Sequence, residues 1–158
     1  MKCDYIFGYG SLVNDKSRRK SIAKKRPHAK TKRNIPSYID KKFGYTKKYN
    51  VTHKKELVLG LESNKHNPKD IYGLLFEVTN EDLGKLTRRE RYYKLKRIPN
   101  KYLRTSVGRK RIPAKKVCTF LPKRKYKTSK RNQSKKKINP LYKKTVRNGF
   151  THYNMPVF

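Results

Sequence analysis

The N-terminal part of the chain contains a glycine turn whose composition suits the binding of an anion. An apolar stretch passes through Gly8 into Tyr9-Gly10-Ser11-Leu12, which we call the cradle loop. Glycines permit a sharp turn and a close backbone approach, so that successive N–H groups can point at one ligand. Read alone, the same residues also fit an ordinary turn at the end of a strand. The segment by itself leaves both interpretations open.

Glu90 is the second residue whose surroundings could support chemistry. It is the last acidic residue of the chain, and it lies among three arginines, Arg88, Arg89 and Arg91. Burial against the neighbouring aromatic residues would raise the pKa of its carboxyl group, as general acid and base chemistry requires. Nearby guanidinium groups would lower that pKa, so a chemical role requires the arginines to point outward. From the local sequence alone, a structural ion pair is the simpler interpretation.

Short apolar clusters predict the strands that must position these residues. The clusters are rich in β-branched and aromatic side chains and are bounded by glycine, proline, asparagine or charges. They comprise Tyr5 to Tyr9, Leu57 to Leu61, Ile71 to Val78, Tyr92 to Ile98, and Val117 to Leu121. This pattern predicts a mixed sheet or a small barrel.

Two helices are predicted beside these strands. One covers Asn80 to Leu86, with Thr79 or Asn80 as N-cap and acidic residues in its first turn. The other opens at Pro140-Leu141-Tyr142 and ends at Gly149. The predicted fold class is therefore α+β, a small mixed-sheet or β-barrel domain with short flanking helices. With 158 residues, of which 34% are hydrophobic and 35% charged, the chain is expected to form one domain with one modest core.

Four motifs, taken in order along the chain, resemble the gamma-glutamylcyclotransferase-like family. They are the cradle loop, a Gly-Leu-Glu strand at Leu59 to Glu62, a Tyr-Gly-x-Leu-Phe-Glu-Val strand at Tyr72 to Val78, and an Arg-Glu-x-Tyr-Tyr segment at Arg89 to Tyr93. The likeness covers most of residues 4 to 98. It resumes faintly at residues 117 to 121 and at 139 to 149, where Pro140, Tyr142 and Gly149 sit like the closing helix of the family.

The resemblance implies an enzyme that cyclises a gamma-glutamyl compound to 5-oxoproline and releases the attached amine. It places Glu90 at the catalytic acid/base position. It also implies that the cradle loop, Tyr9 to Leu12, holds the substrate with its backbone N–H groups, and that Tyr93 and Tyr142 contact the substrate. The substrate would be a small anionic gamma-glutamyl compound, and no metal or cofactor is implied.

Two residues depart from the pattern of the family. Members commonly carry Asp where this chain has Thr87 and a small residue where it has Arg91. Thr87 can still hydrogen-bond within the turn, so the fold is little affected. The bulk of Arg91 bears on the shape of the pocket and on the choice of substrate.

The excess of basic residues suggests a second class of function. Lysines and arginines number 45 against 10 acidic residues, a formal net charge of +35. Lys16 to Arg33 and Lys123 to Lys137 contain no acidic residue, and the second run is expected to be a disordered, solvated loop. Both could neutralise phosphates of nucleic acid or another polyanion. The alternative to the enzyme is therefore a nucleic-acid-associated protein that uses the same fold without catalysis.

The cysteines and histidines suggest neither a disulfide framework nor a metal site. Cys3 and Cys118 are isolated, and Cys118 is expected to be a buried free thiol. This favours a reducing compartment, and the lack of a long apolar run favours a soluble, cytoplasmic protein without membrane contact. The isolated histidines are expected to be exposed or structural: His28, His53, His66 and His152. Ser11 has no recognisable activating histidine, so its hydroxyl is expected to contact the substrate rather than to act as a nucleophile.

Overall fold

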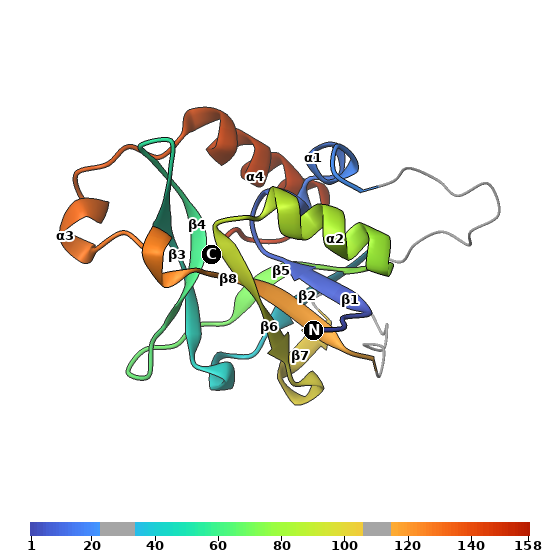
Figure 1. Ribbon diagram of the computed structural model, residues 1–158. Coiled ribbons are helices and arrows are strands. Elements are labelled where there is room, and N and C mark those ends of the chain that lie inside the picture. The colour runs from blue at the N-terminus through green and yellow to red at the C-terminus, as the bar shows by residue number, and fades with distance from the viewer. Residues whose placement is uncertain (23–33, 106–114) are drawn as a thin grey trace.

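Two sheets and several short helices make up the computed structural model, which describes residues 1–22, 34–105 and 115–158 (Figure 1). The strands are β1 (Tyr5–Gly8), β2 (Asn34–Ile39), β3 (Tyr45–His53), β4 (Glu56–Ser63), β5 (Ile71–Glu77), β6 (Tyr93–Ile98), β7 (Leu103–Thr105) and β8 (Val117–Pro122). The α-helices are α1 (Asp15–Arg19), α2 (Asn80–Arg89), α3 (Lys130–Gln133) and α4 (Pro140–His152). Short 3-10 helices are η1 (Ser11–Val13), η2 (Lys41–Phe43), η3 (Asn100–Tyr102) and η4 (Arg124–Tyr126).

The larger sheet is built around β1 and determines where the cradle loop lies. Its strand order is β6-β8-β1-β5-β2-β7, and the second sheet is the hairpin β3-β4. β1 pairs antiparallel with β5 and parallel with β8, and every residue of β1 and β8 is buried. Such burial suits strands that are covered on both faces. The predicted mixed sheet and α+β class are confirmed, and over the described residues the sheet stays open rather than closing into a barrel.

The five strands predicted from apolar clusters are confirmed as β1, β4, β5, β6 and β8. The sequence pattern does not predict β2, β3 or β7. In β3 two lysines replace the apolar alternation, and the strand forms because it pairs with β4 along its length. In β2 the proline at position 36 argues locally against a strand. The strand nevertheless pairs with β5 along its whole length, and with β7 from Ser37 to Ile39.

Both predicted helices are confirmed, and both are longer than predicted. α2 begins at a capping box in which Thr79 and Asp82 exchange hydrogen bonds, and it continues to Arg89. α4 begins behind Asn139 and runs through Gly149 to His152, so the expectation that Gly149 ends the helix is wrong. A Cβ atom at Gly149 would lie 2.7 Å from the backbone nitrogen of Asn14. This glycine therefore serves the close packing of α4 against the start of α1 rather than a helix end.

The basic segment 123–137 differs from the expectation of a disordered loop. It contains η4 and α3 and is tied to β3 by backbone contacts. The Thr128 N–H donates to the Asn50 carbonyl at 2.8 Å, and Val51 and Lys127 form an isolated bridge. These contacts anchor the backbone while the charged side chains extend into solvent. The charge run alone could not reveal them.

Cys3 and Cys118 form a disulfide, so the expectations of a free thiol at Cys118 and of no disulfide are wrong. The parallel pairing of β1 with β8 places Tyr5 beside Val117 and Ile6 beside Cys118. The two cysteines thereby come to a Cα–Cα distance of 5.9 Å although 115 residues separate them in the chain. Sequence spacing could not predict this pairing, because it depends on which strands are neighbours.

Within the described ranges, the longest helices fall short of the length and apolarity that crossing a bilayer requires.

Candidate active site

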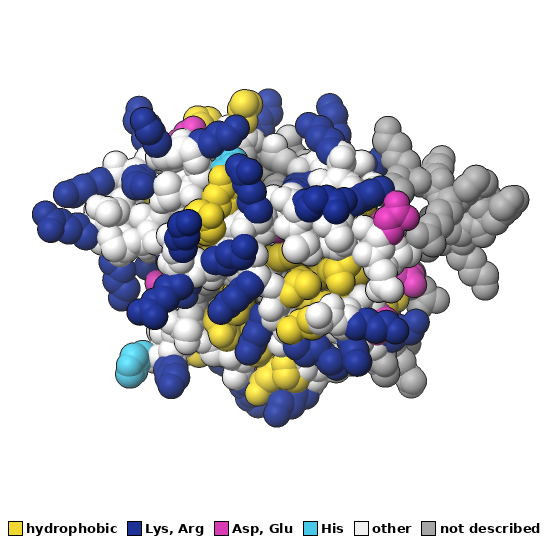
Figure 2. Space-filling model, in the orientation of Figure 1, with side chains coloured by type: hydrophobic (Ala, Val, Ile, Leu, Met, Phe, Trp, Pro, Cys, Tyr) yellow, Lys and Arg dark blue, Asp and Glu magenta, His cyan; other side chains and the backbone are white. Residues whose placement is uncertain are grey.

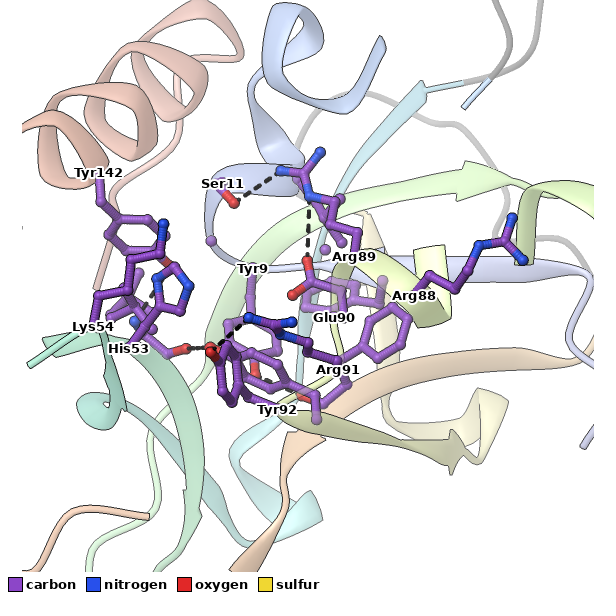
Figure 3. Close-up of a pocket in the computed structure, with 18 residues that line it drawn as sticks. Tyr9, Ser11, His53, Lys54, Arg88, Arg89, Glu90, Arg91, Tyr92 and Tyr142 are labelled. Carbon is purple, nitrogen blue, oxygen red and sulfur yellow. Dashed lines mark hydrogen bonds and ion pairs between the residues drawn. The ribbon is translucent and has the colours of Figure 1, made fainter. Parts of the chain in front are cut away.

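A cavity of about 420 Å³ lies where the cradle loop meets the end of α2 (Figure 3). Its walls come from five parts of the chain: the end of β1 with the cradle loop, the β3-β4 hairpin, the turn from α2 into β6, Phe120 of β8, and α4. The seven residues predicted for the site all line it: Tyr9, Gly10, Ser11, Leu12, Glu90, Tyr93 and Tyr142. The structure therefore brings together residues up to 133 positions apart, while their roles in catalysis remain predictions.

Glu90 is held in the cavity wall by the end of α2. It caps the C-terminus of the helix, and its N–H donates to the Leu86 carbonyl at 2.8 Å. The side chain is only 15% exposed. Burial raises the pKa of the Glu90 carboxyl group, and the charge of Arg89 opposes that rise without cancelling it. A raised pKa makes a carboxyl group better suited to accept a proton and to return it.

The three arginines around Glu90 have different orientations. Arg88 points away from the carboxylate, whereas Arg89 reaches toward it (Figure 3). The Arg89 Nε atom lies 3.7 Å from Glu90 Oε1, an ion pair longer than a hydrogen bond. The requirement that all three arginines point outward is therefore not met. The raised pKa of Glu90 persists because desolvation outweighs this one charge.

Arg89 ties Glu90 to the cradle loop. Its guanidinium group donates to the Ser11 hydroxyl at 3.1 Å, to the carbonyl and hydroxyl of Ser17 at 2.7 Å each, and to the Ser21 hydroxyl at 3.1 Å. Most of its donors are thus engaged by serines rather than by the carboxylate. Sequence reasoning missed this role, because nothing local distinguishes Arg89 from its two neighbours.

The cradle loop lines the cavity and leads into η1, which begins behind Gly10. The first hydrogen bonds of this turn run from Val13 N–H to the Gly10 carbonyl and from Asn14 N–H to the Ser11 carbonyl, each at 3.1 Å. The amides that precede them have no acceptor within the helix, as at any helix start. Arg18 is buried and donates to the Leu12 carbonyl at 2.7 Å, which fixes the turn from behind.

Three tyrosines line the same cavity as the Glu90 carboxyl group. Tyr9 donates to the Phe120 carbonyl at 2.5 Å, Tyr93 donates to the Leu59 carbonyl at 2.6 Å, and Tyr142 accepts from the Leu59 N–H at 3.2 Å. Burial raises the pKa of all three phenols, and the charge of Glu90 adds to that rise. They therefore remain neutral at physiological pH. Gly10 leaves the space that Tyr142 needs, because a Cβ atom there would lie 2.7 Å from its hydroxyl.

The β3-β4 hairpin contributes two cavity residues that sequence reasoning did not assign, His53 and Lys54. The His53 ring contacts the edge of Tyr92, with centroids 5.0 Å apart. Burial, Lys54 and Arg91 together lower the pKa of His53. The sequence predicted only that His53 would be exposed or structural. Its place in the cavity could not be predicted, because the fold alone brings this hairpin close to the start of β6.

The fold is shared with solved structures. No protein-family model matches the sequence, and no curated protein matches it either. A solved structure described as gamma-glutamyl cyclotransferase superimposes with a TM-score of 0.66 at 11% identity, covering 98% of this chain and 82% of that one. The uncharacterized human protein loc79017 gives a TM-score of 0.63 at 12% identity, with 97% and 81% coverage. YkqA from Bacillus subtilis gives 0.63 at 17% identity, and this chain spans 49% of its length.

At these sequence identities the structural likeness shows that the backbone fold is shared, and it shows nothing about activity or substrate. It extends over nearly the whole chain. The resemblance inferred from the four sequence motifs is thereby confirmed at the level of architecture: the chain has the gamma-glutamylcyclotransferase-like fold.

Proposed function

We propose that this protein is a gamma-glutamylcyclotransferase-type enzyme, which cyclises the gamma-glutamyl part of its substrate to 5-oxoproline and releases the attached amine. One observation carries the proposal: a buried carboxyl group, Glu90, and the cradle loop line one cavity of about 420 Å³. The likeness in fold to a structure described as gamma-glutamyl cyclotransferase also supports this proposed activity. A cavity of this size suits a ligand of a few amino-acid residues.

In the proposed reaction, both reacting groups belong to one molecule. The α-nitrogen of the substrate loses a proton to the Glu90 carboxylate and attacks the γ-carbonyl carbon. The new carbon–nitrogen bond closes the ring, the bond to the leaving nitrogen breaks, and Glu90 delivers a proton to that nitrogen. In all, the α-ammonium group loses two protons and the leaving nitrogen gains two. The reaction is therefore balanced without water.

The remaining cavity residues act by position and charge. Holding the substrate bent brings the amine to attack distance, which can lower the barrier by several kcal/mol. Backbone N–H groups at the start of η1 would stabilise the negative charge that develops on the carbonyl oxygen. The neutral phenols of Tyr9, Tyr93 and Tyr142 exclude water and leave Glu90 as the base.

The test is release of 5-oxoproline from a panel of gamma-glutamyl amino acids, peptides and amines, followed by mass spectrometry. Glu90→Gln keeps the shape of the side chain and removes its proton transfer, so turnover should fall by about 10²- to 10⁴-fold. Glu81→Gln is the matched control, because Glu81 is exposed at the other end of α2 and pairs with Lys85. Turnover by the Glu81→Gln variant should equal that of the unmodified protein. Absence of 5-oxoproline with every substrate, or full activity in Glu90→Gln, would contradict the proposal.

A second function is favoured by the basic segment 123–137. We propose that it binds nucleic acid or another polyanion alongside any catalysis. Its backbone is anchored to β3, and eight of its nine basic side chains are exposed, all but Lys136. Figure 2 shows lysines and arginines spread over the visible face, including the region of α3. The other predicted run, 16–33, lies partly outside the described residues.

Binding of this kind should weaken steeply with salt. Retention of labelled duplex DNA or RNA would be measured at rising ionic strength, with Lys130, Arg131 and Lys135 together changed to glutamine. We expect weaker retention and a shallower salt dependence than in the unmodified protein. Unchanged retention in this variant would contradict the proposal that segment 123–137 binds nucleic acid.

A further inference from the structure

The mouth of the cavity carries cations that the proposed reaction does not use. Glu90 is the only carboxylate among the described residues that line the cavity, whereas four lysines and arginines line it: Lys54, Arg88, Arg89 and Arg91. Arg89 is engaged by serine oxygens and by Glu90. Glu90 and Arg89 balance each other's charge, and the three remaining cations leave the cavity with a net positive charge.

Two of these cations, Lys54 and Arg91, belong to one cluster with His53 and Tyr92, which we call the mouth cluster. Arg91 lies over the Tyr92 ring at 5.1 Å from its centroid and donates to the Tyr92 hydroxyl at 3.1 Å. His53 contacts the same ring at 5.0 Å. The charges of both Lys54 and Arg91 act on His53 and lower its pKa. The β3-β4 hairpin and the turn before β6 thus bring two positive charges close to the contacting rings of His53 and Tyr92.

Neither charge of the mouth cluster is neutralised within the described part of the chain. Lys54 and Arg91 are exposed, and none of the ion pairs found there joins them to a carboxylate. The partners of Arg91 are a phenol ring and a phenol hydroxyl, which satisfy one donor and leave the positive charge unpaired. An anion entering the cavity would supply the missing charge.

From this arrangement we infer that the mouth cluster selects gamma-glutamyl compounds whose leaving amine carries a carboxylate, as in amino acids and peptides, over neutral or cationic amines. The inference rests on the proposed function. With the glutamyl part held at Glu90, the exposed cations Lys54 and Arg91 of the same cavity remain available to contact the leaving part. A guanidinium and an ammonium group suit a carboxylate there and repel a second ammonium group.

The test compares three substrates of similar size that differ in the charge of the leaving part: gamma-glutamyl-glycine, gamma-glutamyl-glycinamide and gamma-glutamyl-(2-aminoethyl)amide. We expect kcat/KM to be about tenfold higher for the glycine than for its amide, as charge-assisted contacts predict. It should be lower still for the cationic amine. The preference should shrink as salt is added, because exposed charges are screened.

Variants assign the preference to the mouth cluster. In the double variant Lys54→Gln and Arg91→Gln, the ratio of kcat/KM between glycine and glycinamide substrates should fall to about one. Arg97→Gln is the matched control, because Arg97 is an exposed residue of β6 outside the cavity and should keep the ratio. All three residues are cationic and the substitutions are alike, so a general effect of charge removal would appear in the control as well.

The outcomes separate this inference from the function on which it rests. Equal kcat/KM for all three substrates would overturn the selectivity and leave the cyclotransferase proposal standing. An equal loss for every substrate in the double variant would also overturn it, since the cations would then serve the glutamyl α-carboxylate common to all three. No 5-oxoproline from any substrate would overturn both.

Discussion

Glu90 and Lys47 are both buried ionisable side chains, and they are held in different ways. Lys47 is 8% exposed, and its ammonium group donates to the carbonyl of Tyr72 at 2.9 Å and to that of Val157, over the ring of Phe150. Burial lowers its pKa well below the ordinary value of 10.5. Glu90 faces a cavity and has a single long ion pair of 3.7 Å with Arg89.

The difference shows how burial serves two purposes in one fold. The Lys47 head group is surrounded by acceptors, so it stabilises the approach of the C-terminal tail to β3 and β5. The Glu90 carboxyl group is desolvated without comparable satisfaction, and it keeps an open side toward the cavity. A buried charge with its contacts made belongs to the architecture. One that is left facing empty space is available for chemistry.

The largest expected effect is that of Glu90→Gln, measured on stability as well as on turnover. It tests whether Glu90 serves chemistry rather than architecture. A carboxyl group whose pKa is raised by folding contributes stability below its ordinary pKa and loses it as the pH rises through the raised value. At neutral pH the Gln variant should therefore unfold at an equal or higher temperature while turnover falls by about 10²- to 10⁴-fold. A marked drop in melting temperature would assign Glu90 a structural role.

Lys47→Met should give the opposite result. It leaves the carbonyls of Tyr72 and Val157 without their donor, so unfolding free energy should fall by about 1–3 kcal/mol while turnover remains. Lys48→Met is the neighbouring control, because the Lys48 side chain is 41% exposed and its pair with Glu62 at 3.5 Å lies at the surface. Its effect, followed by the same denaturant titration, should stay within about 0.5 kcal/mol.

Two glycines, Gly10 at the cavity wall and Gly84 on α2, should respond differently to the same substitution. Gly10→Ala places a Cβ atom 2.7 Å from the Tyr142 hydroxyl, so the phenol must shift. We expect a loss of about 1–3 kcal/mol in stability and a lower kcat/KM. Gly84→Ala on α2 meets nothing within 4 Å and should stabilise the protein by about 0.5–1 kcal/mol. Equal behaviour of the two variants in thermal unfolding would contradict the packing described for the cradle loop.

The smallest expected effect is on the pH profile of Arg89→Gln. Arg89 lowers the pKa of Glu90 against the stronger effect of burial, so its removal should move the pKa further upward. Because the reaction needs the carboxylate, the acid limb of kcat/KM against pH should shift to higher pH. Arg88→Gln, whose guanidinium group points away from Glu90, should leave the limb in place. A shift of the Arg89 limb to lower pH would refute this account.

Much of the fold followed from local patterns in the chain. The apolar clusters predicted five strands, the Thr79 cap predicted α2, and Pro140 predicted the start of α4. The strands β2 and β3 escaped prediction because one contains a proline and the other lysines. Their partners in the sheets, and not their own residues, make them strands.

The candidate site was predicted in its parts and not in its electrostatics. The cradle loop and Glu90 were recognised from residue types and order. The inward position of Arg89 was not, because three arginines in four residues are indistinguishable until the helix fixes which one faces Ser11 and Ser17. The mouth cluster was equally hidden, since Lys54 belongs to a hairpin turn that resembles any solvated turn.

The sequence by itself determined the short-range features: helix caps, strand-forming clusters, the glycine turn and the large positive charge. These depend on residues close together in the chain. The fold was needed to show that Cys3 meets Cys118, that segment 123–137 is anchored to β3, and that Lys54 and Arg91 line the same cavity as Glu90. Contacts of this kind join residues that are distant in the chain, and no local pattern records which surfaces will meet.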